Sequence, residues 1–165
     1  MAWGKAGSTT LASAGNDLDV TFTASKFNQL MVHLVQSADA SMFMNFENNS
    51  STDYAYRHSA NGSEQTEVNQ TKLNWTGSLN QINPNFMVMN IMNISGKEKL
   101  GIGFVVSQTS AGAGNAPSRK EYYVKFDTTT DSGQITRVDF HSSATNAIPA
   151  GSNVSVLGSD LTPSA

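Results

Sequence analysis

Side chains that could act as nucleophiles, acids, bases or metal ligands are few and scattered along this chain of 165 residues. There is no cysteine, and His33, His58 and His141 are too far apart in sequence for metal-ligand spacing. Asp17 and Asp19 would share one face of a strand, where they could hold Ca²⁺ with loop carbonyls or form a solvated polar surface. Phosphate-binding glycine loops and the nucleophilic serine motif are absent. We therefore expect no catalytic residue, no metal and no cofactor, and the sequence predicts a protein that is not an enzyme.

One segment, residues 53–58, combines residue types that are common in binding sites. Tyr54 and Tyr56 would lie on the same face of a strand, with Arg57 and His58 beside them. Tyr and Arg are enriched at energetically important positions of interfaces, and aromatic rings can stack on sugars. Alternatively, the two rings cover the edge of the core and Arg57 faces water. The sequence leaves both interpretations open, and these four residues are candidates for interaction.

Three further residues are candidates for contacts with a partner. Trp3 is a large apolar residue in a small and polar segment, so we expect it to anchor on a neighbouring subunit or on its own domain. Arg119 and Lys120 begin a predicted strand, where charges either protect a sheet edge from pairing or form ion pairs between subunits. Trp75 alternates with Leu73 and is expected in the core, although it could instead extend a sugar-stacking platform.

The composition limits the classes of partner. The formal net charge is −3 and only 14% of residues are charged, so the composition lacks the excess of basic residues that is typical of proteins that bind nucleic acid or an anionic membrane. No apolar run approaches the roughly 20 residues of a membrane helix, and the opening MAWGKAGSTT lacks the features of a signal peptide. Ser, Thr and Asn number 21, 15 and 16, so neutral hydrogen-bonding groups keep the surface soluble. Such a surface suits dense assemblies or extracellular conditions.

The elements that must position these residues are strands. Apolar residues recur with a period of two in short segments that are separated by turn residues such as Asn61-Gly62, and we expect each apolar face to be buried. In one segment Ile102, Phe104 and Val106 form the apolar face, opposite two glycines. The segments are 17–23, 26–37, 41–47, 73–75, 86–94, 100–106, 122–126, 135–140 and 154–156. This pattern predicts an all-β fold, an antiparallel β-sandwich of jelly-roll-like type with 8–10 strands.

The same pattern divides the chain into three parts. We expect an amino-terminal arm at 1–15, a β-sandwich domain at 16–158 and a carboxyl-terminal tail at 159–165. Two long polar segments, 48–70 and 108–118, are predicted to be loops, and loops of that length are commonly functional or mobile.

Several stretches resemble small β-rich virion structural proteins of tailed bacteriophages, marine ones in particular. They are GSTTLASAGNDLDVT followed by KFNQLMVHLV, then YAYRHSANG, and finally NISGKEKLGIGFVVSQTSAGAGNAPSRKEYYVKF. The resemblance implies a capsid decoration, fibre or tail accessory protein at the virion surface, assembled in the host cytoplasm. It also implies other virion proteins as partners and a homo-oligomer, of which a trimer is one form, and it carries over no catalytic residue.

The alternative function that the residues support is a carbohydrate-binding module or lectin-like domain. Tyr54, Tyr56, Arg57 and Trp75 would then form a stacking platform for a cell-surface glycan. Both functions are expectations that depend on which of these side chains reach the surface.

Overall fold

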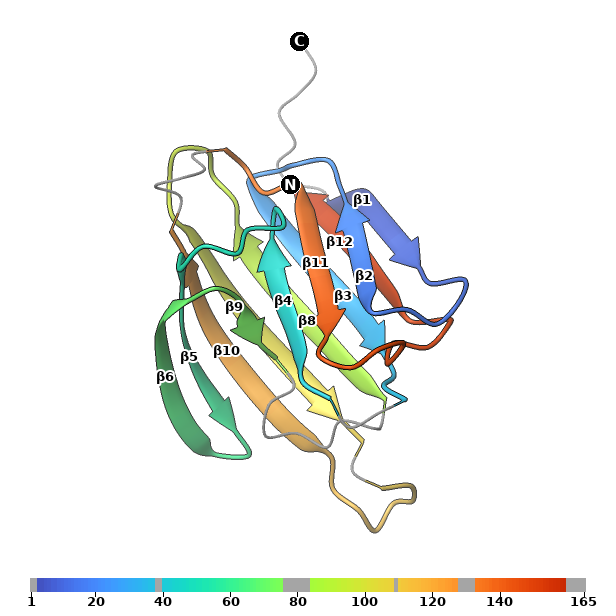
Figure 1. Ribbon diagram of the computed structural model, residues 1–165. Helices are drawn as coiled ribbons and strands as arrows, with labels where there is room; N and C mark the ends of the chain where they lie inside the picture. Colours follow the sequence, from blue (N-terminus) through green and yellow to red (C-terminus); the bar gives the residue numbers. More distant parts are fainter. Residues whose placement is uncertain (1–2, 38–39, 76–83, 109, 128–132, 160–165) are drawn as a thin grey trace.

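The computed structural model describes residues 3–37, 40–75, 84–108, 110–127 and 133–159, which form a sandwich of two antiparallel β-sheets with no helix in the described part. In Figure 1 the smaller sheet lies in front of the larger one. The all-β, jelly-roll-like sandwich that the period of two predicts is confirmed, but the described residues form twelve strands rather than the predicted 8–10, because polar strands add to those with apolar alternation. The strands are β1 (Trp3–Thr10), β2 (Asp17–Thr21), β3 (Phe27–Leu34), β4 (Met42–Phe46), β5 (Tyr54–Ala60), β6 (Ser63–Gln70), β7 (Leu73–Asn74), β8 (Asn85–Met92), β9 (Lys99–Ser107), β10 (Ser118–Phe126), β11 (Arg137–Ser142) and β12 (Asn153–Ser159).

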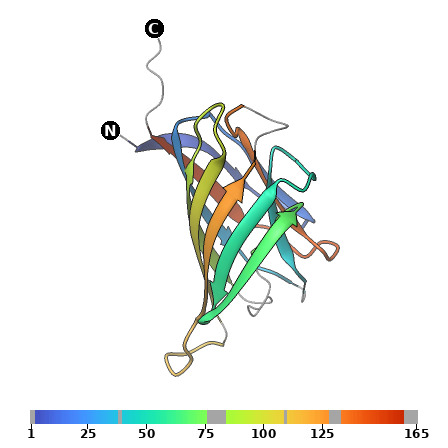
Figure 2. The same cartoon turned by 90° about the vertical axis from the view of Figure 1, so that its left-hand side faces the viewer.

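The large sheet has eight strands in the order β1-β12-β3-β8-β9-β10-β5-β6, and the small sheet has four in the order β2-β11-β4-β7. Figure 2 looks onto the side of the sandwich where β5 and β6 end the large sheet. The core between the sheets holds Leu30 and Val156 from the large sheet and Val20 and Phe140 from the small one, all of them at most 1% exposed. Trp75 packs edge-on against Phe140 with ring centroids 5.6 Å apart, so its predicted place in the core is confirmed.

The predicted amino-terminal arm is wrong, because residues 3–10 form β1, an edge strand of the large sheet. β1 pairs with β12 over its whole length, with Trp3 opposite Ser159. The small and polar residues of this segment hide the strand from a hydrophobic pattern, because much of its surface stays exposed. Ser159 likewise belongs to β12 rather than to the predicted tail, and residues 160–165 of that tail lie outside the described residues.

The predicted loop at 48–70 is also wrong in its larger part, since it contains the β5–β6 hairpin. Its turn is the predicted one: Asn61 and Gly62 both have positive φ, 49° and 92°, which is the geometry that a two-residue hairpin requires. β6 is a polar edge strand that is exposed along most of its length, so it shows no apolar alternation. Residues 108 and 110–117, in contrast, form no strand, as expected for the second loop.

Candidate functional site

The side chains of β9 face in the direction opposite to the one predicted. Ile102, Phe104 and Val106 point away from the core and are 49%, 48% and 45% exposed, whereas Gly101 and Gly103 point inward. A Cβ atom on Gly103 would lie 2.9 Å from the Met89 Cε atom, so the end of the Met89 side chain would have to shift to admit it. The expectation that the apolar face of this segment is buried is therefore wrong.

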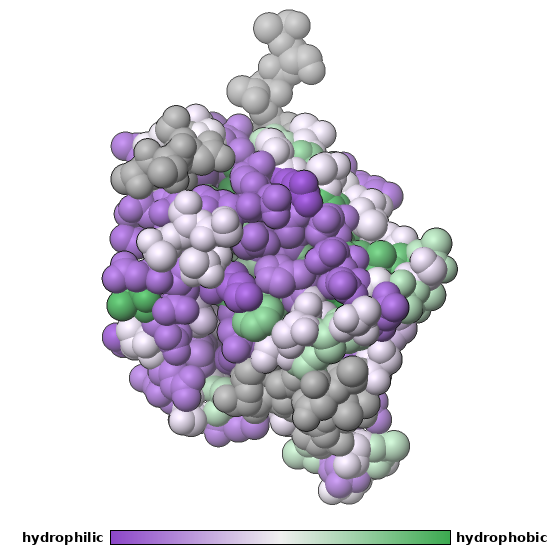
Figure 3. Space-filling view, viewed as in Figure 1, coloured by the Kyte–Doolittle hydropathy of each residue, from purple (hydrophilic) through white to green (hydrophobic). Residues whose placement is uncertain are grey.

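Apolar residues of the neighbouring strands lie beside these side chains and enlarge the apolar surface. Val106 lies opposite Phe86 of β8, and Ile102 lies opposite Tyr123 of β10. We name the surface the outer apolar face. It consists of Trp3, Phe27, Val68, Phe86, Leu100, Ile102, Phe104, Val106 and Tyr123. Every large hydrophobic residue that is exposed in the described part of the chain belongs to this set, and all are on strands of the large sheet. The opposite side of the molecule is mostly hydrophilic (Figure 3).

The outer apolar face is hollowed in three places. A depression of about 460 Å³ crosses β6, β5, β10 and β9, with Arg57, Val68 and Tyr123 in its lining. A second one, of about 290 Å³, is lined by residues that include Trp3 and Phe27. Leu100 and Ile102 line both depressions, so the two adjoin. The surface is therefore uneven, and its depressions can accept side chains of a partner.

A third depression, of about 280 Å³, lies where the loop after β9 meets the sheet. Phe86 and Val106 line it from the strands, and Gln108, Asn115 and Pro117 line it from the loop. The predicted functional loop thus borders the outer apolar face.

Two ion pairs lie at the margin of this face. Lys125 Nζ lies 3.0 Å from Glu98 Oε1, and Arg119 pairs with Glu121. Because these pairs are exposed, they contribute little to the stability of the fold. These two pairs need no counter-charge from a partner.

The predicted interaction residues divide between the two sides of the large sheet. Trp3 and Arg57 line the depressions on the outer side, and Arg119 is exposed on the same side. Tyr54 and Tyr56 point into the core and are 1% and 6% exposed. Of the two interpretations of this segment, the structure therefore has the one in which the rings cover the core and Arg57 faces water.

His58 and Lys120 are buried with these tyrosines, because residues two apart on β5 share its inner face and Lys120 alternates with Arg119. The rings of Tyr56 and His58 stack with centroids 5.6 Å apart. Lys120 Nζ donates a hydrogen bond of 3.0 Å to the Asn74 carbonyl. β10 lies between β9 and β5, so Arg119 and Lys120 do not protect a sheet edge, and that interpretation is wrong.

Burial changes the acid–base behaviour of this inner cluster. It lowers the pKa of Lys120 to about 8, and it lowers the pKa of His58, to which the charge of Lys120 contributes. Burial also raises the pKa values of Tyr56 and Tyr122. In the part of the chain that the structure describes, no group of three or more His, Asp or Glu residues is placed to hold a metal ion.

The outer apolar face was not predicted, although the sequence contains one signal for it. In β9 large apolar residues alternate with glycines. Either the face with the large side chains or the face with the glycines could pack against a core. Asp17 and Asp19 do share the outer face of β2, as predicted, on the far side of the sandwich.

Comparison with known proteins adds little. No protein-family model and no curated protein matches the chain. Among solved structures, the chain is similar to the alginate lyase Aly36B in complex with an alginate tetrasaccharide, with a TM-score of 0.40 and 10% sequence identity over 93% of this chain and 80% of that chain. So distant a similarity carries no argument about activity. No helix that could span a membrane occurs in the ranges that the structure covers.

Proposed function

We propose that this protein is a non-enzymatic structural protein that assembles with further protein subunits, first with a second copy of itself, through the outer apolar face. The sequence resemblance supports a virion as the setting, with the chain as a capsid decoration or a fibre or tail accessory protein. The observation that carries the proposal is the set of exposed apolar side chains on one sheet.

The size of this surface favours assembly. Its large side chains are each about half exposed, which amounts to an apolar area on the order of 500 Å². The largest apolar patch of a typical monomer is roughly 300–600 Å² and is often functional, and burying such a patch releases free energy in proportion to its area. Trp3, Tyr123 and Arg57 lie in or beside the depressions, and Trp, Tyr and Arg are the residue types that dominate binding energy at interfaces.

The chemistry of the face favours a second copy as the occupant. Lys125 and Arg119 at its margin are paired with Glu98 and Glu121, so these four charges need no counter-charge from a second copy. A saccharide is a poor match, because its hydroxyl groups need polar partners that the apolar centre of the face does not offer. The stacking platform of Tyr54, Tyr56 and Trp75 is closed to a glycan in this fold, since all three rings are buried.

The test compares one substitution on each side of the molecule. Ile102→Asp places a charge at the centre of the outer apolar face, and Thr21→Asp places the same side chain on an exposed strand position of the small sheet. We expect the unmodified protein to sediment as an oligomer at micromolar concentration, Ile102→Asp to sediment as a monomer, and Thr21→Asp to remain oligomeric. Trp3→Ala should weaken the association without removing β1.

Circular dichroism establishes that each variant keeps its strands. A wild-type protein that stays monomeric at high concentration, or an Ile102→Asp variant that associates as strongly as wild type, would contradict the proposal. The virion setting is tested separately, by mass spectrometry of purified particles.

A further inference from the structure

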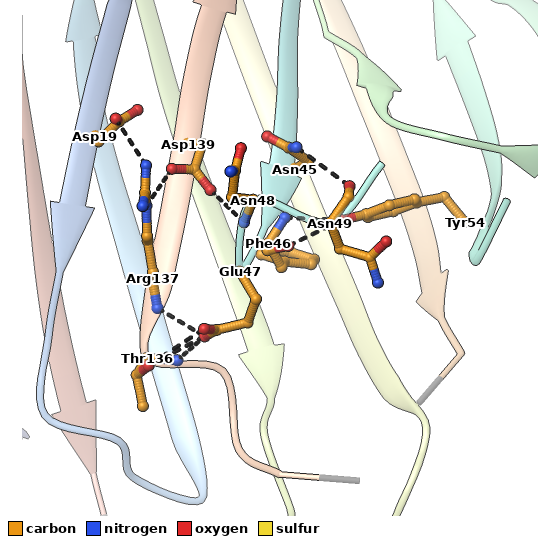
Figure 4. A network of polar contacts seen from close by, with 10 residues as sticks. All are labelled: Asp19, Asn45, Phe46, Glu47, Asn48, Asn49, Tyr54, Thr136, Arg137 and Asp139. Atoms are coloured by element: carbon orange, nitrogen blue, oxygen red, sulfur yellow. Dashed lines mark hydrogen bonds and ion pairs between the residues drawn. The ribbon is translucent and has the colours of Figure 1, made fainter. Parts of the chain in front are cut away.

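A polar hollow of about 470 Å³ opens on the outer surface of the small sheet, on the side opposite the outer apolar face. We name it the polar basin. It is lined by Asn16, Asp17, Asp19, Asn45, Asn48, Arg137, Asp139, His141 and Ser142. Its volume lies within the range of roughly 300–1,000 Å³ that is usual for small-molecule sites. Figure 4 shows its centre.

Strand register places the acidic side chains of the basin together. Asp139 of β11 lies opposite Asp19 of β2 and opposite Asn45 of β4. Arg137 bridges the two carboxylates: Nη2 lies 2.9 Å from Asp19 Oδ2, and Nε donates to Asp139 Oδ1 (Figure 4). Partial burial, together with the charge of Asp139, raises the pKa of Asp19.

The wall of the basin at Asn48 is held in a defined conformation. Glu47 and Asn48 both have positive φ, 56° and 53°, in the turn that follows β4. The Glu47 carboxylate accepts a hydrogen bond of 2.9 Å from the Arg137 backbone N–H, and the Asn48 backbone N–H donates one of 2.8 Å to Asp139 Oδ2. The polar groups are therefore fixed before any ligand arrives, which reduces the entropy lost on binding.

One buried acceptor in the basin is left without a partner. Asn45 is only 7% exposed, its Nδ2 donates to the Asn49 carbonyl at 3.2 Å, and its Oδ1 has no hydrogen-bond partner. In Figure 4 this oxygen points away from Asn49, toward the side of the sheet where Asp139 lies. A buried polar atom without a partner is costly, so the site calls for a hydrogen-bond donor.

The charges of the basin narrow the class of ligand. The lining holds three carboxylates, Asp17, Asp19 and Asp139, and one guanidinium, Arg137. Burial and the charge of Lys72 lower the pKa of the remaining titratable group, His141. The excess of carboxylates repels anions. Arg137 already occupies the space between Asp19 and Asp139 that a cation would need.

We propose that the polar basin binds a neutral saccharide, whose hydroxyl groups donate to Asn45 Oδ1 and to the carboxylates of Asp17 and Asp19. Hydroxyl groups are neutral donors that replace water at fixed acceptors with little loss of hydrogen bonding. The His141 ring, which stacks on Phe43 with centroids 5.4 Å apart, supplies a flat and less polar wall for the carbon–hydrogen face of a sugar. This site is separate from the outer apolar face.

The experiment is an NMR titration of the isotope-labelled chain with maltotriose, lactose and mannobiose, and with trigalacturonate as the anionic comparison. We expect at least one neutral sugar to shift the backbone amide signals of Asn48 and Arg137 in a saturable way, and trigalacturonate to leave them unchanged. Titration with CaCl₂ should also leave these signals in place.

Two variants locate the binding. Asp17→Ala removes an exposed acceptor of the basin and Asn45→Leu removes the unpaired one, and each should weaken binding of the active sugar at least about tenfold, the loss expected for one good hydrogen bond to a charged or buried acceptor. Glu64→Ala, on the exposed edge strand β6, is the matched control and should bind as wild type does.

Several results would overturn the saccharide site. They are the absence of shifts with all three neutral sugars, equal binding of trigalacturonate, shifts of the same signals by Ca²⁺, and full binding by Asp17→Ala and Asn45→Leu. Melting temperatures of the variants separate lost binding from lost folding. Ile102→Asp should retain sugar binding, so failure of the assembly proposal and failure of this one are distinguishable.

Discussion

At the scale of single residues, Lys120 shows how a charged side chain is accommodated between two sheets. It is 2% exposed, it donates to the Asn74 carbonyl, and its Nζ atom lies 5.0 Å from the centre of the Tyr122 ring. The hydrogen bond and the ring offset part of the cost of removing an ammonium group from water. The remaining cost lowers its pKa to about 8, well below the usual 10.5.

This shift predicts a pH dependence of stability. Between about pH 8 and 10.5 the unfolded chain holds the Lys120 proton more tightly than the folded one, so the free energy of unfolding rises with pH. Relative to Lys120→Met, the wild-type protein should gain about 2 kcal/mol between pH 7 and pH 9.5. Denaturant unfolding of both proteins at the two pH values measures the gain. Parallel pH profiles would show that Lys120 keeps an ordinary pKa in the folded state.

At the scale of elements, β1 is defined by its close approach to the small sheet as well as by its pairing with β12. A Cβ atom on Gly7 would lie 2.4 Å from the Thr21 carbonyl oxygen and 2.8 Å from the Phe22 Cβ atom, so only glycine fits there. Gly7 also coincides with a register shift in the β1–β12 pairing. Gly4, on the same strand, has no atom within 4 Å of such a Cβ position.

The two glycines make a matched pair for a stability test. Gly7→Ala must displace backbone, and such overpacking costs about 1–3 kcal/mol, whereas Gly4→Ala should stay within about 0.5 kcal/mol of wild type. Thermal or denaturant unfolding of the two variants gives both values. If Gly7→Ala were as stable as Gly4→Ala, residues 3–10 would not be held against the small sheet as the structure has them.

At the scale of the whole molecule, the sandwich has two sides of different chemistry. The small sheet carries the polar basin on a hydrophilic surface (Figure 3), and the large sheet carries the outer apolar face. Because the core separates them, a subunit that is joined to others through the large sheet would keep its basin open to solvent. If both proposals hold, the subunit assembles through one sheet and binds a sugar on the other.

The apolar character of the interface predicts how association responds to salt. Ion pairs between subunits weaken as salt screens them, whereas burial of apolar surface is strengthened by sulfate. We therefore expect the oligomer to persist in concentrated NaCl and to tighten in ammonium sulfate. Sedimentation velocity at several salt concentrations measures this. Dissociation by moderate NaCl would indicate that charged residues such as Arg119 and Lys125 hold the subunits together instead.

The sequence alone predicted the class of the fold and the Asn61-Gly62 turn. Alternation with period two requires strands, and Asn61-Gly62 favours the left-handed backbone of a tight hairpin, because both are local properties of the chain. It also placed Asp17 and Asp19 on one face and Trp75 in the core. Strands without apolar alternation, β1 and β6, escaped prediction, since polar edge strands are recognised only by the partners they pair with.

For β9, in contrast, the buried side depends on tertiary packing that its local pattern does not report. β9 could have turned either face inward, and it turned Gly101 and Gly103 toward Met89 and the core. Likewise Arg137 meets Asp19 across 118 residues of sequence, because β11 pairs with β2. Local patterns report periodicity but not direction, and direction depends on packing against residues that are distant in the chain.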